Sequence, residues 1–135
     1  MITELKDNQV FVFGSNRAGR HGKGAALTAL RKFGAKNGQG IGLMGKSYGI
    51  PTKGRKLDVL PLFAIEIQVN RFLLFAHKNR HLEFLVTPIG CGLAGYKPKQ
   101  IAPFFEGASE NVILPDCFDR IVPKPTEKGE YDNPK

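Results

Sequence analysis

Residues 84–96 read FLVTPIGCGLAGY and pass from an apolar run into a glycine-rich loop. A continuous apolar run is typical of a strand that is covered on both faces. The three glycines that follow it, Gly90, Gly92 and Gly95, permit sharp turns and a close approach of the backbone to another group. Pro98 then suits the first turn of a helix. The order of strand, glycine loop and helix start predicts an anion site, because free N–H groups and the helix dipole would both face the ligand.

The same order recurs near the start of the chain. Residues 10–13, VFVF, predict a buried strand, and GSN follows at residues 14–16. Residues 17–24 are basic and glycine-rich, and residues 25–33 carry apolar side chains on one helical face. The sequence therefore predicts two anion-binding sites, each formed by a glycine-rich loop between a strand and a helix.

Further elements follow from hydrophobic periodicity. Residues 48–52 and 111–114 predict two more strands, and residues 62–76 predict a long helix, because apolar residues recur there at three- and four-residue steps. The glycine-rich residues 34–49 predict an ordered loop or a short strand pair. Alternation of strands and helices predicts an α/β protein with a mixed, mostly parallel sheet.

The 135 residues suit a single domain, which we expect at residues 1–122, with a flexible tail at residues 123–135. No apolar run approaches the roughly 20 residues that span a bilayer, and no signal-peptide pattern occurs. We therefore expect a soluble, cytoplasmic protein with no membrane partner. Cys91 and Cys117 have neither a CxxC partner nor the other ligands of a zinc site, so we expect no metal and no cofactor.

The formal charge of +8 is unevenly distributed along the chain. Residues 1–56 hold eleven Lys and Arg against Glu4 and Asp7, a net of +9, whereas residues 57–135 have a net of −1. Such a field attracts phosphates, whether on a small nucleotide or on a nucleic acid. Cations of this half, Lys53 and Arg55 among them, would clamp phosphate or form an ordinary solvated surface.

Two nucleotide-binding patterns occur, and neither has its full structural context. Residues 40–47, GIGLMGKS, match GxxxxGK[ST], but no buried strand precedes them and no helix start follows, so we interpret the match as accidental. Gly90, Gly92 and Gly95 match GxGxxG, yet only one predicted strand follows, whereas a dinucleotide-binding fold needs further strand–helix units. A nicotinamide-dependent oxidoreductase is therefore not expected, although the loop itself suits phosphate.

Taken together, FVFGSNRAGRHGKGAALTAL (residues 11–30) and TPIGCGLAGYKPKQIA (residues 87–102) resemble the macro domain family of ADP-ribose-binding modules. The segments GSN, GRHGKGAA, SYGIPTK and GCGLAGY are similar to a compact bacterial and phage branch of macro-domain-like proteins. The resemblance covers residues 9–114 and implies a three-layer α/β/α fold.

The resemblance also implies ligand-binding positions in both loops. Asn16 lies where the family's Asn approaches the distal ribose, and the amides of residues 91–96 would hold the diphosphate. The remaining expected positions are Gly14, Ser15, Gly22, Gly24 and Ala25 in the first loop, and Gly90, Cys91, Gly92, Leu93, Ala94, Gly95 and Tyr96 in the second. No motif assigns an acid to the adenine.

Asn16 and His21 are the candidate catalytic side chains. Asn16 would position the ribose, although an Asn after a strand also stabilises turns. His21 would transfer a proton, because histidine titrates near neutrality, and an exposed loop histidine is the alternative. Cys91 is interpreted as a small residue tolerated between glycines, with a nucleophile as the alternative. Tyr96 would contact a ribose or anchor its loop.

The first functional hypothesis is binding of ADP-ribose or a related ADP-ribosyl nucleotide, with hydrolysis of an ADP-ribosyl linkage left open. A second hypothesis is a basic nucleic-acid-binding module without catalysis, which would show steep salt dependence. A third, sequestration of a modified or cyclic ADP-ribose signal, would use the same pocket as the first. The oligomeric state is not predicted.

Overall fold

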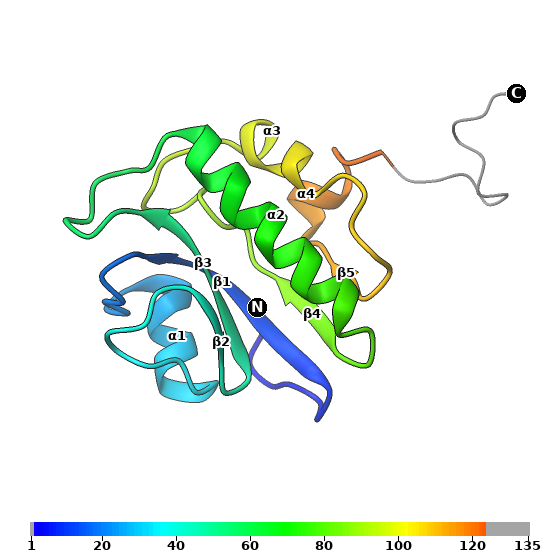
Figure 1. Ribbon diagram of the computed structural model, residues 1–135, viewed down its shortest axis with the longest axis horizontal. Helices are drawn as coiled ribbons and strands as arrows, with labels where there is room; N and C mark the ends of the chain where they lie inside the picture. The colour runs from blue at the N-terminus through cyan, green and yellow to red at the C-terminus, as the bar shows by residue number, and fades with distance from the viewer. Residues whose placement is uncertain (1, 124–135) are drawn as a thin grey trace, which may run out of the picture.

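The structure is a computed structural model that describes residues 2–123. Strands and helices largely alternate along the chain (Figure 1). The elements are β1 (Gln9–Asn16), α1 (Gly24–Lys32), β2 (Gly42–Met44), β3 (Ser47–Lys53), α2 (Leu62–Lys78), β4 (Glu83–Val86), α3 (Pro98–Ile101), the 3-10 helix η1 (Ala102–Phe105), β5 (Val112–Ile113) and α4 (Asp116–Asp119). This confirms the predicted α/β class.

The strands form one five-stranded sheet in the order β2-β3-β1-β4-β5. Strand β1 pairs in parallel with β3 and β4, and β4 pairs in parallel with β5. Only β2 is antiparallel, because it forms a hairpin with β3. The sheet is therefore mixed and mostly parallel, as predicted, and the ends of β1, β3 and β4 lie side by side.

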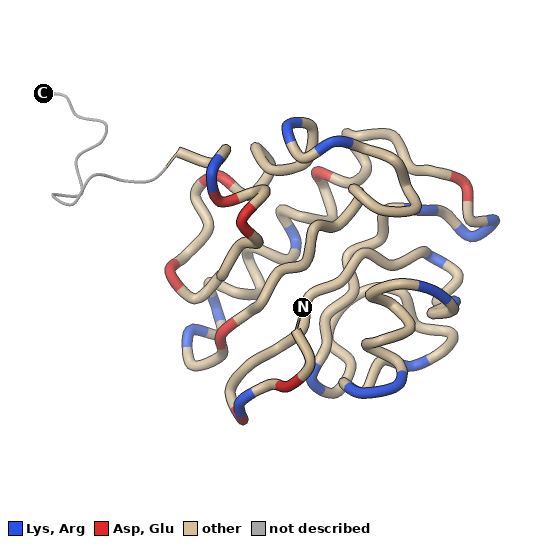
Figure 2. Tube along the Cα trace, turned by 180° about the vertical axis from the view of Figure 1, so that it is seen from behind, with Lys and Arg blue, Asp and Glu red and all other residues tan. Residues whose placement is uncertain are grey.

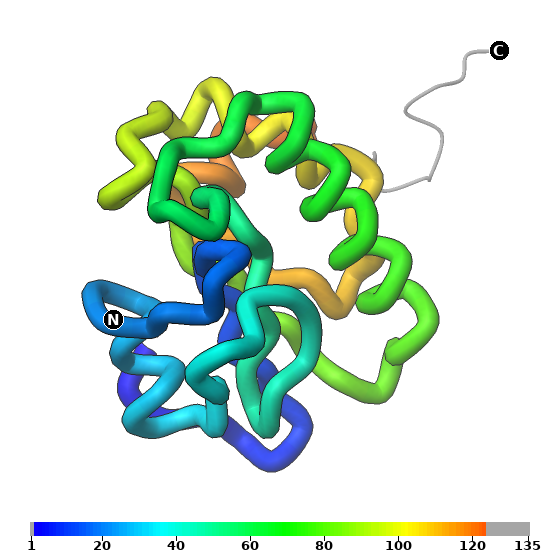
Figure 3. The backbone as a smooth tube through the Cα atoms, turned by 60° about the vertical axis from the view of Figure 1, so that its left-hand side comes forward, coloured from blue at the N-terminus to red at the C-terminus, as the bar shows by residue number. Residues whose placement is uncertain are grey.

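Alternate residues of β1 face two separate clusters of buried side chains. Phe11 and Phe13 pack with Ala29 of α1 in one cluster, whereas Val10 and Val12 belong to the cluster under α2. Helices α1 and α2 consequently lie on opposite sides of the strands (Figure 3). A strand covered on both faces must be apolar throughout, which explains the continuous VFVF run.

Helix α1 leaves part of its side of the sheet uncovered. Leu85 pairs with Phe11 across the parallel register, and Ile113 pairs with Leu85, so these three side chains share the α1 face. Ile113 is nonetheless 42% exposed. The sheet therefore presents an apolar surface at β4 and β5 that no described helix covers.

The C-terminal part of the described chain differs from the sequence-based expectation in two ways. The helix at Pro98 has only four residues and continues as a short 3-10 helix. An unexpected helix, α4, follows Pro115, and its Phe118 is fully buried at 5.6 Å from the ring of Phe105. Phe118 is the only aromatic residue of α4, and it holds this helix against the core. A helix of four residues is too short to show hydrophobic periodicity, so the sequence did not predict it.

The predicted tail falls almost entirely outside the described part of the chain. Val122 still packs against the core, and residues 124–135 are not described. None of the helices within residues 2–123 combines the length and the apolar character needed to span a bilayer.

Candidate functional site

The two glycine loops meet at a cleft of about 640 Å³ beside the ends of β1, β3 and β4. A methyl group placed on Gly14 would lie 3.5 Å from the backbone N of Gly90, so the loops are in direct proximity. The predicted residues that line the cleft are Gly14, Ser15, Asn16, Gly22, Gly24 and Ala25 from the first loop, and Gly90, Gly92, Leu93 and Ala94 from the second. The expectation that the two loops come together is confirmed.

The start of α1 supplies free donors to this cleft. Gly24, Ala25 and Ala26 line it, and within residues 2–123 their N–H groups have no acceptor. The N-cap residue Lys23 makes no side-chain capping bond, and the first turn contains no acid. An uncapped N-terminus with its positive dipole end is suited to an anion.

The second loop supplies fewer free amides than expected. The N–H groups of Cys91, Gly95 and Tyr96 already donate to the carbonyls of Pro88, Gly92 and Gly90. The expectation that all amides of residues 91–96 are available is therefore wrong for these three positions.

The remaining amides of this loop are those of Gly90, Gly92, Leu93 and Ala94, for which the described chain provides no acceptor. The helix behind the loop does not add to them. Helix α3 is too short to build a large dipole, and the Lys97 N–H at its start already donates to Gln100 Oε1. The anion-binding character of the second loop therefore comes from its backbone alone.

Gly22 and Gly92 have no conformational reason to be glycine. Neither has a positive φ, and a Cβ at either position would meet nothing within 4 Å. Both line the cleft. A ligand that approaches the backbone closely would account for the absent side chains at these positions.

The charge around the cleft is positive. Arg20, Lys23 and Lys53 line it, and no Asp or Glu is among its described lining residues. Lys53 was considered as a phosphate clamp, and its place in the cleft agrees with that interpretation. Uncompensated cations in a concave site favour an anionic ligand.

Asn16 lies in the cleft wall, but its side chain is engaged with the loop. Its Nδ2 donates to the Arg20 carbonyl at 2.8 Å, and its Oδ1 accepts from the Arg20 N–H at 2.9 Å. The paired bonds close residues 16–20 into a compact turn. The expected catalytic role of Asn16 is not supported by this arrangement, and we assign it the role of shaping the first loop.

His21 was expected to be a proton-transfer group or an exposed loop residue, and the structure buries it outside the lining of the cleft. Its ring is 1% exposed, does not line the cleft, and packs edge-on against Phe13. Its Nε2 lies 2.8 Å from the carbonyl oxygens of both Lys36 and Gln39, so this nitrogen carries a hydrogen and donates. His21 ties the first loop to residues 36–39 of the next one.

We expect His21→Ala to reduce the free energy of unfolding by about 2–3 kcal/mol, because two part-buried carbonyls lose their donor and a cavity forms in place of the buried ring. Because the imidazole does not line the cleft, ligand affinity should change by less than about threefold under conditions where the variant is folded. Urea titration and calorimetry would measure the two effects. Loss of affinity or activity without loss of stability would contradict this assignment.

Three predicted ligand residues, Cys91, Gly95 and Tyr96, do not line the cleft. The Tyr96 hydroxyl donates to the Leu60 carbonyl at 2.6 Å, and its ring packs against the core. Tyr96 therefore anchors the loop, which was the alternative to a ribose contact. Burial, with a smaller contribution from Cys117, raises the pKa of the Cys91 thiol to about 11.

The raised pKa of Cys91 predicts an unreactive thiol. The folded state retains the thiol proton more strongly than the unfolded chain, so the contribution of Cys91 to stability is lost as the pH rises from about 9 to about 11. At pH 8 we expect Cys91 to react with iodoacetamide at least about tenfold more slowly than a free cysteine. Peptide mapping would measure the rate, and labelling as fast as in the urea-unfolded chain would contradict the prediction.

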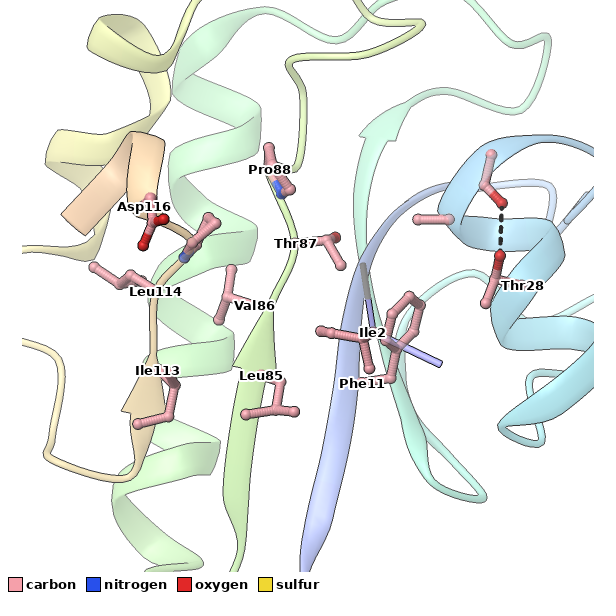
Figure 4. Close-up of a pocket in the computed structure, with 13 residues that line it drawn as sticks. Ile2, Phe11, Thr28, Leu85, Val86, Thr87, Pro88, Ile113, Leu114 and Asp116 are labelled. Carbon is pink, nitrogen blue, oxygen red and sulfur yellow. Dashed lines mark hydrogen bonds between the residues drawn. The ribbon is translucent and has the colours of Figure 1, made fainter. Parts of the chain in front are cut away.

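A second cavity, of about 720 Å³, adjoins the cleft on the uncovered side of the sheet (Figure 4). Both cavities are lined by Gly24, Ala25, Thr87 and Pro88. The walls of the second cavity are mainly apolar and include Leu85, Ile113 and Leu114, whereas Asp116 lies at its edge. The sequence alone does not reveal this cavity, because only the packing of residues 2–123 shows that no described helix covers the α1 side of β4 and β5.

Residues 40–47 do not form a phosphate-binding loop. They contribute to the hairpin of β2 and β3, the Lys46 Nζ donates to the Lys6 carbonyl, and the Ser47 hydroxyl donates to the Met44 carbonyl. The interpretation of the GxxxxGK[ST] match as accidental is confirmed.

The cleft lacks a side chain suited to activating water. No carboxylate or imidazole is among its described lining residues. Its hydroxyl groups donate to backbone carbonyls: Ser15 to Gly40, Thr52 to Ser15 and Thr87 to Val12. The arrangement suits binding of an anion more than acid–base chemistry.

Comparison of the chain with protein-family models, with curated proteins and with solved structures found no match.

Proposed function

We propose that this protein binds ADP-ribose or a closely related ADP-ribosyl nucleotide in a three-layer, macro-domain-like fold. The main support for this proposal is that the two glycine loops place unbonded backbone amides around one cleft. Three cationic side chains also line this cleft, and no acidic side chain is among its described lining residues. Donors of fixed direction together with positive charge suit a diphosphate, because both its charge and its oxygen atoms are satisfied.

The adjoining apolar cavity supports a nucleotide over inorganic phosphate or a simple diphosphate. A ligand seated across the shared residues would place its diphosphate between the loops and its base against Leu85 and Ile113. Asp116 would accept a hydrogen bond from the exocyclic amine of adenine. The distal ribose would face the wall formed by Asn16 and Lys53.

Hydrolysis is the less supported half of the hypothesis. The described cleft offers no general base, so we expect bound ADP-ribose and its linkages to remain intact. A modified or cyclic ADP-ribose would fit the same cleft and should be tested for competition with ADP-ribose.

Calorimetric titration with ADP-ribose, ADP, AMP and NAD tests the proposal. ADP-ribose should bind most tightly, because it alone presents a diphosphate, an adenine and a free distal ribose together. Absence of heat with all four ligands would refute nucleotide binding.

The role of Asp116 can be tested by comparing ADP-ribose with its hypoxanthine analogue, which lacks the exocyclic amine. The protein should prefer ADP-ribose by about tenfold, and Asp116→Ala should remove that preference by weakening ADP-ribose binding alone. Asp119→Ala on the same short helix is the control, since Asp119 does not line the cavity. An unchanged preference in Asp116→Ala would place the base elsewhere.

The distribution of charge favours nucleic acid as a second candidate ligand. Lys and Arg residues (blue) outnumber Asp and Glu residues (red) in the half of the molecule around α1 and its neighbouring loops (Figure 2). Arg17, Arg55 and Lys56 are exposed next to the cleft loops and extend the positive surface beyond the cavity. This candidate predicts affinity for RNA or DNA that falls steeply with salt concentration.

A further inference from the structure

Helix α2 carries a second apolar stripe on its outer side. Phe63, Ile67 and Leu74 are 68%, 60% and 56% exposed. At 100° per residue these three side chains lie within about 40° of one another around the helix axis. The buried residues Ile65 and Phe72 lie on the opposite side, so α2 is apolar on both its inner and outer faces.

Such a stripe is unusual on an isolated surface. Contiguous exposed apolar side chains mark sites of association, whereas single ones need no explanation. The stripe lines neither of the two cavities, so the proposed nucleotide site does not account for it. Its three apolar residues recur at the four- and seven-residue spacings of a helix–helix seam.

We propose that this stripe is the seam of a homodimer in which α2 packs in parallel against α2 of a second copy. In a heptad reading Ile67 and Leu74 take the a positions, and Phe63 and Asn70 take the d positions. Each residue then meets its own counterpart across the two-fold axis. Asn70 faces Asn70 of the second copy, and the exposed His77 takes the next d position, so the apolar part of the seam ends in polar pairs.

The flanking charges select this partner and this direction. Glu66 and Arg71 are exposed on opposite flanks of the stripe and are five residues apart. In a parallel pair, opposite flanks meet, and Glu66 of each copy lies beside Arg71 of the other. An antiparallel pair that sets Phe63 against Leu74 would leave Glu66 and Arg71 on opposite sides of the seam.

The test is sedimentation equilibrium of the full chain from about 5 to about 500 µM. A seam of this size should give a dissociation constant on the order of tens of micromolar, since small interfaces are weak. Leu74→Glu should remove association, and at about 5 µM, where the protein is mainly monomeric, it should leave the thermal unfolding midpoint unchanged, because Leu74 is largely exposed. A monomer throughout the concentration range, or an unchanged dimer in Leu74→Glu, would overturn the proposal.

Charge reversal tests the direction of the helices. Glu66→Arg or Arg71→Glu alone should raise the dissociation constant about tenfold, because each creates two like-charge contacts per dimer. An equimolar mixture of the two variants should associate as well as the original protein, since both contacts become attractive in the heterodimer. Lys32→Glu, an exposed reversal on α1, is the matched control and should have no effect. Failure of the mixture to recover would overturn the parallel arrangement.

Discussion

Gly92→Glu is expected to weaken ADP-ribose binding at least about 100-fold without destabilising the protein. Gly92 lines the cleft, and its N–H is one of the unbonded donors of the second loop. A carboxylate about 4 Å from a phosphate costs on the order of 4 kcal/mol at the effective dielectric of a protein surface. The fold should tolerate the side chain, because a Cβ at this position meets nothing within 4 Å and φ is not positive.

Gly92→Gln is the matched control for this experiment. Glutamine has nearly the volume of glutamate but no charge, so a much smaller loss of affinity would assign the effect to electrostatics. Lys99→Gln lowers the net charge by one, as Gly92→Glu does, at an exposed position outside the cleft, and therefore controls for net charge. Calorimetry gives the affinities, and urea titration checks that stability is unchanged.

The same variant separates the two candidate functions. If the protein binds nucleic acid through its basic surface, Gly92→Glu should leave that binding nearly intact, whereas ADP-ribose binding should be lost. Retention of ADP-ribose affinity in Gly92→Glu would contradict the proposed place of the diphosphate. Loss of affinity in both Gly92→Glu and Gly92→Gln to the same extent would assign the effect to steric exclusion.

Gly40→Ala is expected to have the largest effect on stability, a loss of about 3 kcal/mol in the free energy of unfolding. A Cβ on Gly40 would collide with the backbone carbonyl of Asn16, at the end of β1. The Ser15 hydroxyl also donates to the Gly40 carbonyl, so the two segments are tightly joined. The strand end would have to move, and the cleft wall would move with it.

Gly22→Ala is the matched control for Gly40→Ala. A Cβ on Gly22 would meet no atom within 4 Å, and φ is not positive there, so the change should alter stability by less than about 1 kcal/mol. Urea titration of both variants measures the difference. Equal stability of the two variants would show that the contact between Gly40 and Asn16 can relax without cost.

The sequence predicted the main elements because their signals are local and strong. The VFVF run, the apolar residues 84–86 and the long amphipathic periodicity of residues 62–76 each correspond to an observed element. The glycine content of residues 14–24 and 90–95 also identified both loops of the cleft. These signals come from which side chains must be buried, and that is encoded residue by residue.

The roles of individual site residues were predicted less well, because they depend on partners distant in sequence. His21 meets the carbonyls of residues 15 and 18 positions further on, and Tyr96 meets Leu60, 36 positions earlier. Asn16 is a local case, but the same Asn side chain can hold a turn or a ligand, and only its observed bonds to Arg20 distinguish these uses.

By itself, the sequence determined an α/β chain with two glycine loops after strands and a positively charged N-terminal half. The tertiary structure alone decided that both loops border one cleft, that an apolar cavity adjoins it and that some loop amides are already bonded within the chain. The physical reason is that burial is a property of each residue, whereas the direction of an amide and the shape of a cavity arise only when segments distant in the sequence pack together.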